Sequence, residues 1–163
     1  MEKSKSVLTC TRILYLFFII ACIANLLLSV YITVQKNHND TVAVEECFLG
    51  DGGCYTVQTS IYAKTFGIAN PYYGMGFFGI GILLFSLLLA NSYRAFIPKL
   101  YLKEGLDIIQ FFLIIGAVFS IWLLYVQFFI LVTTCKYCLW VDAIMIVMVA
   151  LFSVYKKKFV DEK

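Results

Sequence analysis

Apolar residues gather in four long segments separated by shorter polar stretches. The segments run from about 13 to 34, 72 to 95, 108 to 132 and 139 to 155. An α-helix rises about 1.5 Å per residue, so roughly 20 apolar residues cross the hydrocarbon core of a bilayer. The fourth segment is the shortest and carries one acid, Asp142, near its start. The pattern predicts an all-α integral membrane protein built as a bundle of four transmembrane helices.

Composition agrees with a membrane setting. The chain has 163 residues, of which 62% are hydrophobic and 14% are charged, whereas soluble domains average about 45–50% and about 25%. At this length we expect a single domain over residues 1–163. The net charge of +3 is too small and too dispersed to indicate a nucleic-acid partner.

The distribution of basic residues predicts the orientation. With four spans, both termini lie on one side, and the first loop (about 35–71) and the third-to-fourth junction lie on the other. Ten of the thirteen basic residues fall on the side of the termini; Lys36, Lys64 and Lys136 fall opposite. The positive-inside rule therefore places both termini in the cytoplasm. The first loop then faces an oxidising compartment in which disulfides persist.

Four of the six cysteines fall on the oxidising side. Cys47 and Cys54 form a C-x6-C pair in the first loop, and Cys135 and Cys138 form C-K-Y-C at the start of the fourth helix. This spacing at a helix start is typical of dithiol redox centres. The helix dipole and Lys136 are expected to lower the pKa of the first thiol. Two pairs on one face predict thiol–disulfide exchange between them.

The loop after Cys54 carries a second pattern. Between Tyr55 and Gly67, the residues Val57, Ile61 and Phe66 recur at near-helical spacing. We expect a short amphipathic helix at the membrane interface that covers the mouth of the bundle. Ordinary interfacial packing is the alternative interpretation.

These residues carry a family resemblance. The chain resembles the vitamin K epoxide reductase family, prokaryotic members included, in its four helices, its loop cysteines and its C-x-x-C at the fourth helix. Local matches are Cys54 followed by Ser60, a Phe-Gly pair at 66–67, and Asn70 four residues before Gly74. The order of motifs differs from the DsbB-type disulfide oxidases, which place C-x-x-C before the second helix.

The resemblance implies a route for electrons. Cys47 would exchange with a separate thioredoxin-like (DsbA-like) thiol protein, and Cys54 would carry electrons to Cys135. Cys138 would deliver them to a quinone held in the bundle. No metal and no flavin is required by this route, because the quinone supplies the electron chemistry.

Three further residues are candidates for the quinone site. The resemblance implies that Ser60 shapes the loop and that Asn70 donates a hydrogen bond to a quinone oxygen. Asp142 stands where the vertebrate enzymes have a quinone-binding tyrosine, which favours menaquinone or ubiquinone over vitamin K epoxide. Alternatively, Ser60 caps a short helix, Asn70 forms a turn with Pro71, and Asp142 complements the helix dipole. An acid at membrane depth is costly, so Asp142 is also a candidate proton relay.

The sequence therefore predicts an enzyme: a quinone-dependent thiol–disulfide oxidoreductase that reoxidises a thioredoxin-like partner. We expect it in a prokaryotic plasma (inner) membrane. A vitamin K (epoxide) reductase of the endoplasmic reticulum is the alternative. Two further alternatives are a membrane protein in which four cysteines bind zinc and a non-catalytic scaffold with structural disulfides.

Overall fold

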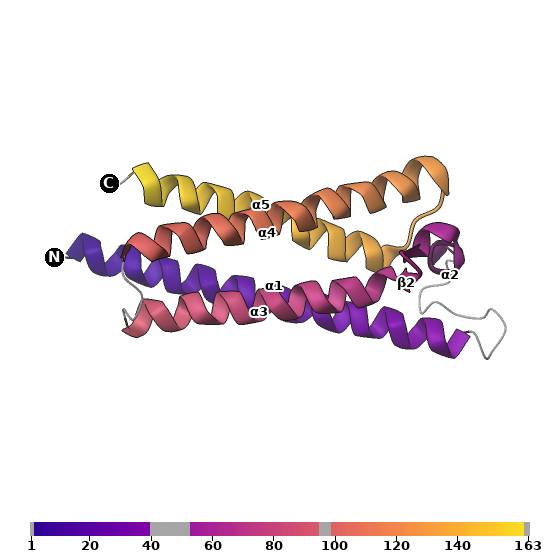
Figure 1. The fold of residues 1–163 in the computed structure, drawn as a ribbon, viewed down its shortest axis with the longest axis horizontal. Coiled ribbons are helices and arrows are strands. Elements are labelled where there is room, and N and C mark those ends of the chain that lie inside the picture. Colours follow the sequence, from indigo (N-terminus) through magenta and orange to yellow (C-terminus); the bar gives the residue numbers. More distant parts are fainter. Residues whose placement is uncertain (1, 40–52, 95–98, 162–163) are drawn as a thin grey trace.

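Four long helices run side by side along one axis (Figure 1). The computed structural model describes residues 2–39, 53–94 and 99–161. The long helices are α1 (Glu2–Asn39), α3 (Asn70–Arg94), α4 (Lys99–Tyr125) and α5 (Lys136–Asp161). In the described part of the chain, four helical stretches are long and apolar enough to cross a membrane. The predicted four-helix membrane bundle is confirmed.

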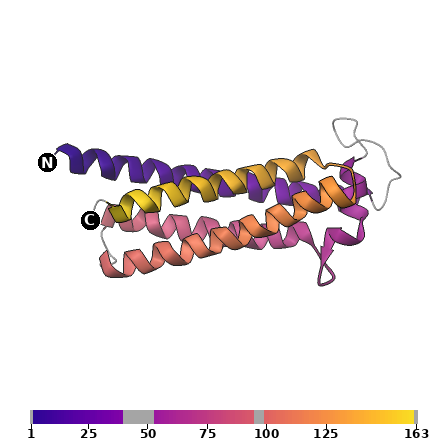
Figure 2. The same ribbon diagram turned by 90° about the horizontal axis from the view of Figure 1, so that it is seen from above.

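The segment between α1 and α3 forms a small cap at one end of the bundle. It contains α2 (Gly53–Thr59), the 3-10 helix η1 (Ile61–Ala63), and the strands β1 (Lys64–Thr65) and β2 (Ile68–Ala69), which pair antiparallel. Both views place this cap and the α4–α5 junction at the end opposite to the two termini (Figures 1 and 2). The hairpin of β1 and β2, in magenta, projects sideways from the bundle in Figure 2.

The predicted helix in the first loop exists but is shorter than expected. It ends at Thr59, because Ser60 adopts an extended backbone and its hydroxyl donates to the Val57 carbonyl at 2.8 Å. That bond occupies a carbonyl that a continuing helix would use. Beyond it, Phe66 (φ 50°) and Gly67 (φ 81°) both have positive φ, as a two-residue hairpin turn requires. The expectation of a helix reaching Gly67 is therefore wrong.

Helix starts and ends near the cap have local causes. Pro71 lies in the first turn of α3, where its fixed φ suits a helix and its missing N–H costs nothing. The end of α4 widens into the π-helix η2 (Val126–Ile130), closed by a bond from the Leu131 N–H to the Val126 carbonyl. Cys135 directly precedes α5 and accepts the first helical bond, from the Leu139 N–H.

Aromatic side chains pack together in the half of the bundle nearer the termini. Phe18 of α1, Phe85 of α3 and Phe152 of α5 are all at most 1% exposed. The ring centroids of Phe18 and Phe85 lie 4.8 Å apart and those of Phe18 and Phe152 lie 5.8 Å apart. By contrast, Phe111 and Val118 of α4 are more than 60% exposed, as expected of side chains that face lipid.

Polar contacts close the terminal end of the bundle. The Arg12 guanidinium of α1 donates to the Ser92 carbonyl of α3 at 2.9 Å. Lys156 of α5 forms an ion pair with Asp107 of α4. These contacts link the helices in two pairs, far from the cap.

Candidate active site

Three cysteines meet where the cap joins the bundle. Cys54 lies in α2, Cys135 precedes α5, and Cys138 lies in the first turn of α5. Cys54 is 3% exposed and Cys135 is fully buried, while Cys138 is half-buried. The Cys135 side chain forms hydrogen bonds with both Cys54 and Cys138. The fourth predicted cysteine, Cys47, lies outside the described residues.

The central thiol, Cys135, is harder to ionise than the sequence suggested. The hydrogen bond with Cys138 and burial raise the pKa of the Cys135 thiol to about 12, although the hydrogen bond with Cys54 acts in the opposite direction. The expectation of a lowered pKa is therefore wrong. The physical reasons are the hydrogen bond with Cys138 and burial, which both disfavour the thiolate, while Lys136 is exposed to solvent. Cys135 is held as a thiol between its two neighbours.

Gln127 fixes the backbone of Cys135. The Cys135 N–H donates to the Gln127 Oε1 at 3.0 Å, and Gln127 is 2% exposed. Gln127 lies in the π-helix η2, and Val132 in the following junction has φ 49°, an uncommon conformation for a β-branched residue. Irregular backbone of this kind gathers at functional sites. Sequence reasoning missed Gln127, although its amide interrupts an otherwise apolar stretch.

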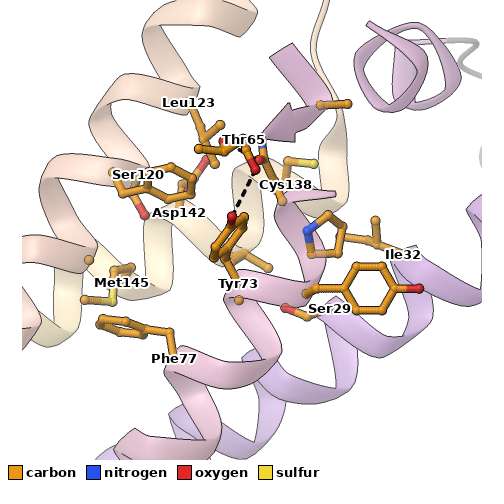
Figure 3. A pocket seen from close by; sticks show the side chains of 18 of the residues that line it. Ser29, Ile32, Thr65, Tyr73, Phe77, Ser120, Leu123, Cys138, Asp142 and Met145 are labelled. Carbon is orange, nitrogen blue, oxygen red and sulfur yellow. Dashed lines mark hydrogen bonds between the residues drawn. The ribbon is translucent and has the colours of Figure 1, made fainter. Parts of the chain in front are cut away.

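Asn70 ties the cap to α3. Its Nδ2 donates to the Tyr62 carbonyl at 2.8 Å, and its Oδ1 accepts from the Thr65 hydroxyl at 2.7 Å. The Tyr73 hydroxyl donates to the Thr65 carbonyl at 2.9 Å (dashed line in Figure 3). Asn70 is therefore more than a turn former. Its amide bonds to η1 through Tyr62 and to β1 through Thr65.

Ser60 plays a comparable local role directly after α2. It precedes the 3-10 helix η1, but its side chain makes no capping bond there. The hydroxyl instead donates back to α2, as described above. Ser60 therefore occupies the N-cap position of η1 without the side-chain bond of a cap, and its hydroxyl closes the preceding helix instead.

A cavity of about 670 Å³ lies beneath the cap. Ser60, Asn70, Cys138 and Asp142, which the sequence singled out separately, all line it. The remaining lining is mainly apolar and aromatic and comes from α3, α4 and α5, with further residues from α1 and the cap. Figure 3 shows Phe77 and Met145 side by side at one part of the wall. An added Cβ at Gly116 would lie 2.5 Å from both, so a glycine is needed there for this packing.

Asp142 is the most unusual group in the lining. It is 2% exposed, and Ser120 of α4 forms a hydrogen bond with its side chain. Its Oδ2 has no hydrogen-bond partner among the described residues. Buried polar atoms are nearly always paired, so a free carboxyl oxygen in a cavity wall indicates a ligand. Ser120 was not predicted, since one serine in a long apolar helix carries no distinctive signal.

Comparison with known protein families shows to which family a chain with this arrangement belongs. The sequence model of the vitamin K epoxide reductase family matches residues 16–153. The chain belongs to this family. The vitamin K epoxide reductase family consists of quinone-linked oxidoreductases, so the protein is an integral membrane enzyme that couples thiol–disulfide chemistry to a quinone. A search of curated proteins found no match.

The cavity fits the quinone that the family uses. Pockets for small ligands usually measure about 300–1,000 Å³ and combine an apolar lining with a few placed polar groups. Here the polar groups include the Cys138 thiol and the unpaired Asp142 oxygen. A bound quinone would accept two electrons and two protons. The residues of the chain would orient it, exclude water and supply thiols at its edge.

Proposed function

We propose that the enzyme reoxidises a thioredoxin-like (DsbA-like) protein and passes the electrons through its cysteines to a membrane quinone. Menaquinone and ubiquinone are the expected acceptors. The membrane is a prokaryotic plasma membrane, with both termini in the cytoplasm and the cap outside. The charge distribution of the sequence supports this orientation, because ten of thirteen basic residues lie on the side of the termini.

The position of Cys135 between Cys54 and Cys138 is the observation that carries the proposal. A thiol that contacts two others can form a disulfide with either. In the proposed route, the reduced partner attacks the Cys47–Cys54 disulfide at Cys47, and the released Cys54 attacks Cys135 of a Cys135–Cys138 disulfide. The second thiol of the partner then releases Cys47, which closes on Cys54 again. Two electrons have moved to the Cys135–Cys138 pair, and each exchange conserves the number of sulfur–sulfur bonds.

The quinone site completes the route. Cys138 is half-buried and lines the cavity, so it can deliver electrons there. The Asn70 Nδ2 carries two protons, and only one is needed for the Tyr62 carbonyl. We assign the other to a quinone oxygen. Ser60 keeps the end of α2 at the cavity wall, and Asp142 contacts the quinone from α5.

The alternative substrate is vitamin K epoxide in the endoplasmic reticulum. The tyrosine of the vertebrate enzymes is replaced by Asp142 in this chain, and Asp142 is bonded to Ser120. A carboxyl group therefore stands where a phenol would contact the ligand in the vertebrate enzymes. This difference favours an ordinary respiratory quinone.

Turnover of the purified protein in detergent tests the function. The assay supplies a reduced thioredoxin-like protein and a soluble quinone and follows quinone absorbance. We expect quinone reduction that disappears in both Cys135→Ala and Cys138→Ala. Cys10→Ser and Cys22→Ser are matched controls that should retain turnover. Absence of reduction with every quinone tested, in folded protein with intact thiols, would contradict the proposal and favour the zinc or scaffold alternatives.

Trapping tests the route separately from turnover. Cys138→Ser should accumulate a disulfide between Cys54 and Cys135, because Cys135 can attack Cys54 of the Cys47–Cys54 disulfide and release Cys47 as a thiol. Mass spectrometry of non-reduced peptides detects this bond. Cys47→Ala should block exchange with the protein partner but leave small dithiols able to reduce the Cys135–Cys138 pair. Full quinone reduction by Cys138→Ser would exclude the proposed order of cysteines.

A further inference from the structure

The pair formed by Asp142 and Ser120 has no structural task in the bundle that would explain it. The bond between them joins α5 to α4 inside the membrane-spanning region. Ordinary helix packing there would be served as well by apolar residues, because burying a carboxyl group costs several kcal/mol unless it is fully paired. The pair satisfies one carboxyl oxygen and leaves Oδ2 without a partner in the described part of the chain.

The surroundings identify what the free oxygen can bind. Among the described residues that line the cavity, none is Lys, Arg or His, so the lining supplies no cation to neutralise a carboxylate. A ligand atom that exchanges a proton or a hydrogen bond with a carboxyl group is the remaining partner. A quinone oxygen fits, because it accepts a hydrogen bond when oxidised and donates one when reduced.

Helix geometry places this oxygen beside the thiol that delivers electrons. Asp142 follows Cys138 by four residues in α5, and residues so spaced lie on one face about 5–6 Å apart at Cβ. Both line the same cavity, and Figure 3 shows Cys138, Asp142 and Ser120 around it. A single ligand ring can therefore lie against the sulfur at one end and the carboxyl group at the other.

We propose that Asp142 is the acid that delivers a proton to the bound quinone and that Ser120 positions its carboxyl group. This inference rests on the proposed function and deepens it. Asp142 is a catalytic residue, since it contacts the quinone oxygen. Ser120 is a positioning residue that acts through Asp142.

The two thiols supply all the electrons and protons that reduction of the quinone needs. Oxidation of Cys135 and Cys138 forms one sulfur–sulfur bond, breaks two S–H bonds, and releases two electrons and two protons. Asp142 gives its carboxylic proton to the quinone oxygen at its end of the cavity and regains one thiol proton. The second thiol proton goes to the other quinone oxygen, so that the product is the hydroquinone.

Infrared difference spectroscopy tests the contact without turnover. The spectrum is recorded on Cys138→Ser protein before and after addition of a soluble quinone, so that binding occurs without reduction. We expect quinone binding to change the C=O stretching band of a protonated carboxyl group. This change should be absent in the double variant that combines Cys138→Ser with Asp142→Asn. Ser120→Ala should retain the band but shift it. A difference spectrum that is identical with and without Asp142→Asn would overturn the contact.

Kinetics test the proton transfer. In a background with all cysteines present, Asp142→Asn keeps the size and hydrogen-bonding capacity of the side chain but removes the acid. General acid catalysis contributes about 10²–10⁴-fold, so we expect kcat for quinone reduction to fall about 100-fold or more. KM should change less than about threefold. Asp142→Glu should recover part of kcat, and Ser120→Ala should lower it by a smaller factor than Asp142→Asn.

A half-reaction without quinone distinguishes a loss of proton transfer in Asp142→Asn from misfolding of the variant. Reduction of the Cys135–Cys138 disulfide by dithiothreitol without quinone, followed by thiol alkylation, should proceed at the same rate in Asp142→Asn as in the unmodified protein. Ser153→Ala, which removes a hydroxyl from α5 away from the cavity, is the matched control for Ser120→Ala and should leave kcat unchanged.

Turnover of the unmodified protein and kcat of Asp142→Asn distinguish failure of the proposed function from failure of the proton-transfer role. If the unmodified protein reduces no quinone, the proposed function itself is wrong. If it reduces quinone and Asp142→Asn retains kcat within about twofold, only the proton-transfer role is wrong. A rise in KM at unchanged kcat would likewise overturn it and leave Asp142 as a binding residue alone.

Discussion

The two ends of the bundle are built on different principles. At the terminal end, the aromatic rings of Phe18, Phe85 and Phe152 fill the space between three helices, and Arg12 bonds to Ser92. At the cap end there is a cavity of about 670 Å³ and an unpaired carboxyl oxygen. The helices are continuous from one end to the other, so the difference lies in the side chains and in local backbone.

Backbone geometry shows the same division. Within the described residues, positive φ angles occur only at Phe66, Gly67 and Val132, all at the cap end. The π-helix η2 also lies at this end. Strained backbone costs about 1–3 kcal/mol per residue and persists where surrounding structure holds it. The comparison indicates that the terminal end stabilises the fold, while the cap end holds conformations that chemistry requires.

The largest expected effect on stability is at the terminal end. Phe18→Ala removes a fully buried ring that contacts three others. We expect a loss of about 3 kcal/mol or more in the free energy of unfolding, because the lost packing contacts are not replaced by lipid. Unfolding in mixed micelles of rising denaturing-detergent content measures it. Phe111→Ala, at a lipid-facing position, is the control. An equal effect of both would contradict a packed terminal core.

The second prediction concerns the protonation of Cys135. Its pKa is raised from 9.0 to about 12, so the folded state holds this proton more tightly than the unfolded chain does. The stabilising contribution is therefore complete below about pH 9 and is lost as pH rises towards 12. Since only the thiolate reacts, alkylation of Cys135 should accelerate about tenfold per pH unit between pH 8 and 10. Peptide mass spectrometry measures the rate, and a plateau below pH 9 would contradict the raised pKa.

The third prediction tests the irregular end of α4. Gln127→Met keeps the length of the side chain but leaves the buried Cys135 N–H without its acceptor. An unsatisfied buried donor costs about 1–3 kcal/mol, and the position of Cys135 should loosen. We expect slower formation of the Cys54–Cys135 disulfide in the Cys138→Ser background. Gln110→Met, in α4 and outside the cavity lining, is the control and should leave that rate unchanged.

The large-scale features of the fold could be predicted because they depend on composition and topology. Apolar length alone fixes the four spans, and an even number of spans brings the loop cysteines to the same end as the C-x-x-C motif. Cys54, Cys135 and Cys138 do meet in the structure. These predictions need no knowledge of how individual side chains pack.

The details at the cap depend on contacts that the sequence does not display. The periodicity of the loop suggested a helix to Gly67, but one hydroxyl bond at Ser60 ends it. The position of Cys135 at a helix start suggested a lowered pKa, but the hydrogen bond with Cys138 and complete burial raise it. Gln127 and Ser120 acquire their roles only when α4 packs on α5. In each case a tertiary contact overrides a local rule.

The smallest effects should have opposite signs at the hairpin and in a regular helix. Gly67 and Gly79 both have open space where a Cβ would be added, so only backbone conformation distinguishes them. Gly67→Ala places a side chain at φ 81° and should destabilise the β1–β2 hairpin by about 1 kcal/mol. Gly79→Ala lies within α3 and should stabilise that helix by about 0.5–1 kcal/mol. Amide hydrogen exchange of residues 64–69 and of α3, followed by mass spectrometry, measures both. If Gly67→Ala left exchange in the hairpin unchanged, the turn would not be strained, and the contrast between a stabilising end and a conformationally demanding end would have to rest on the cavity and the Cys135 junction alone.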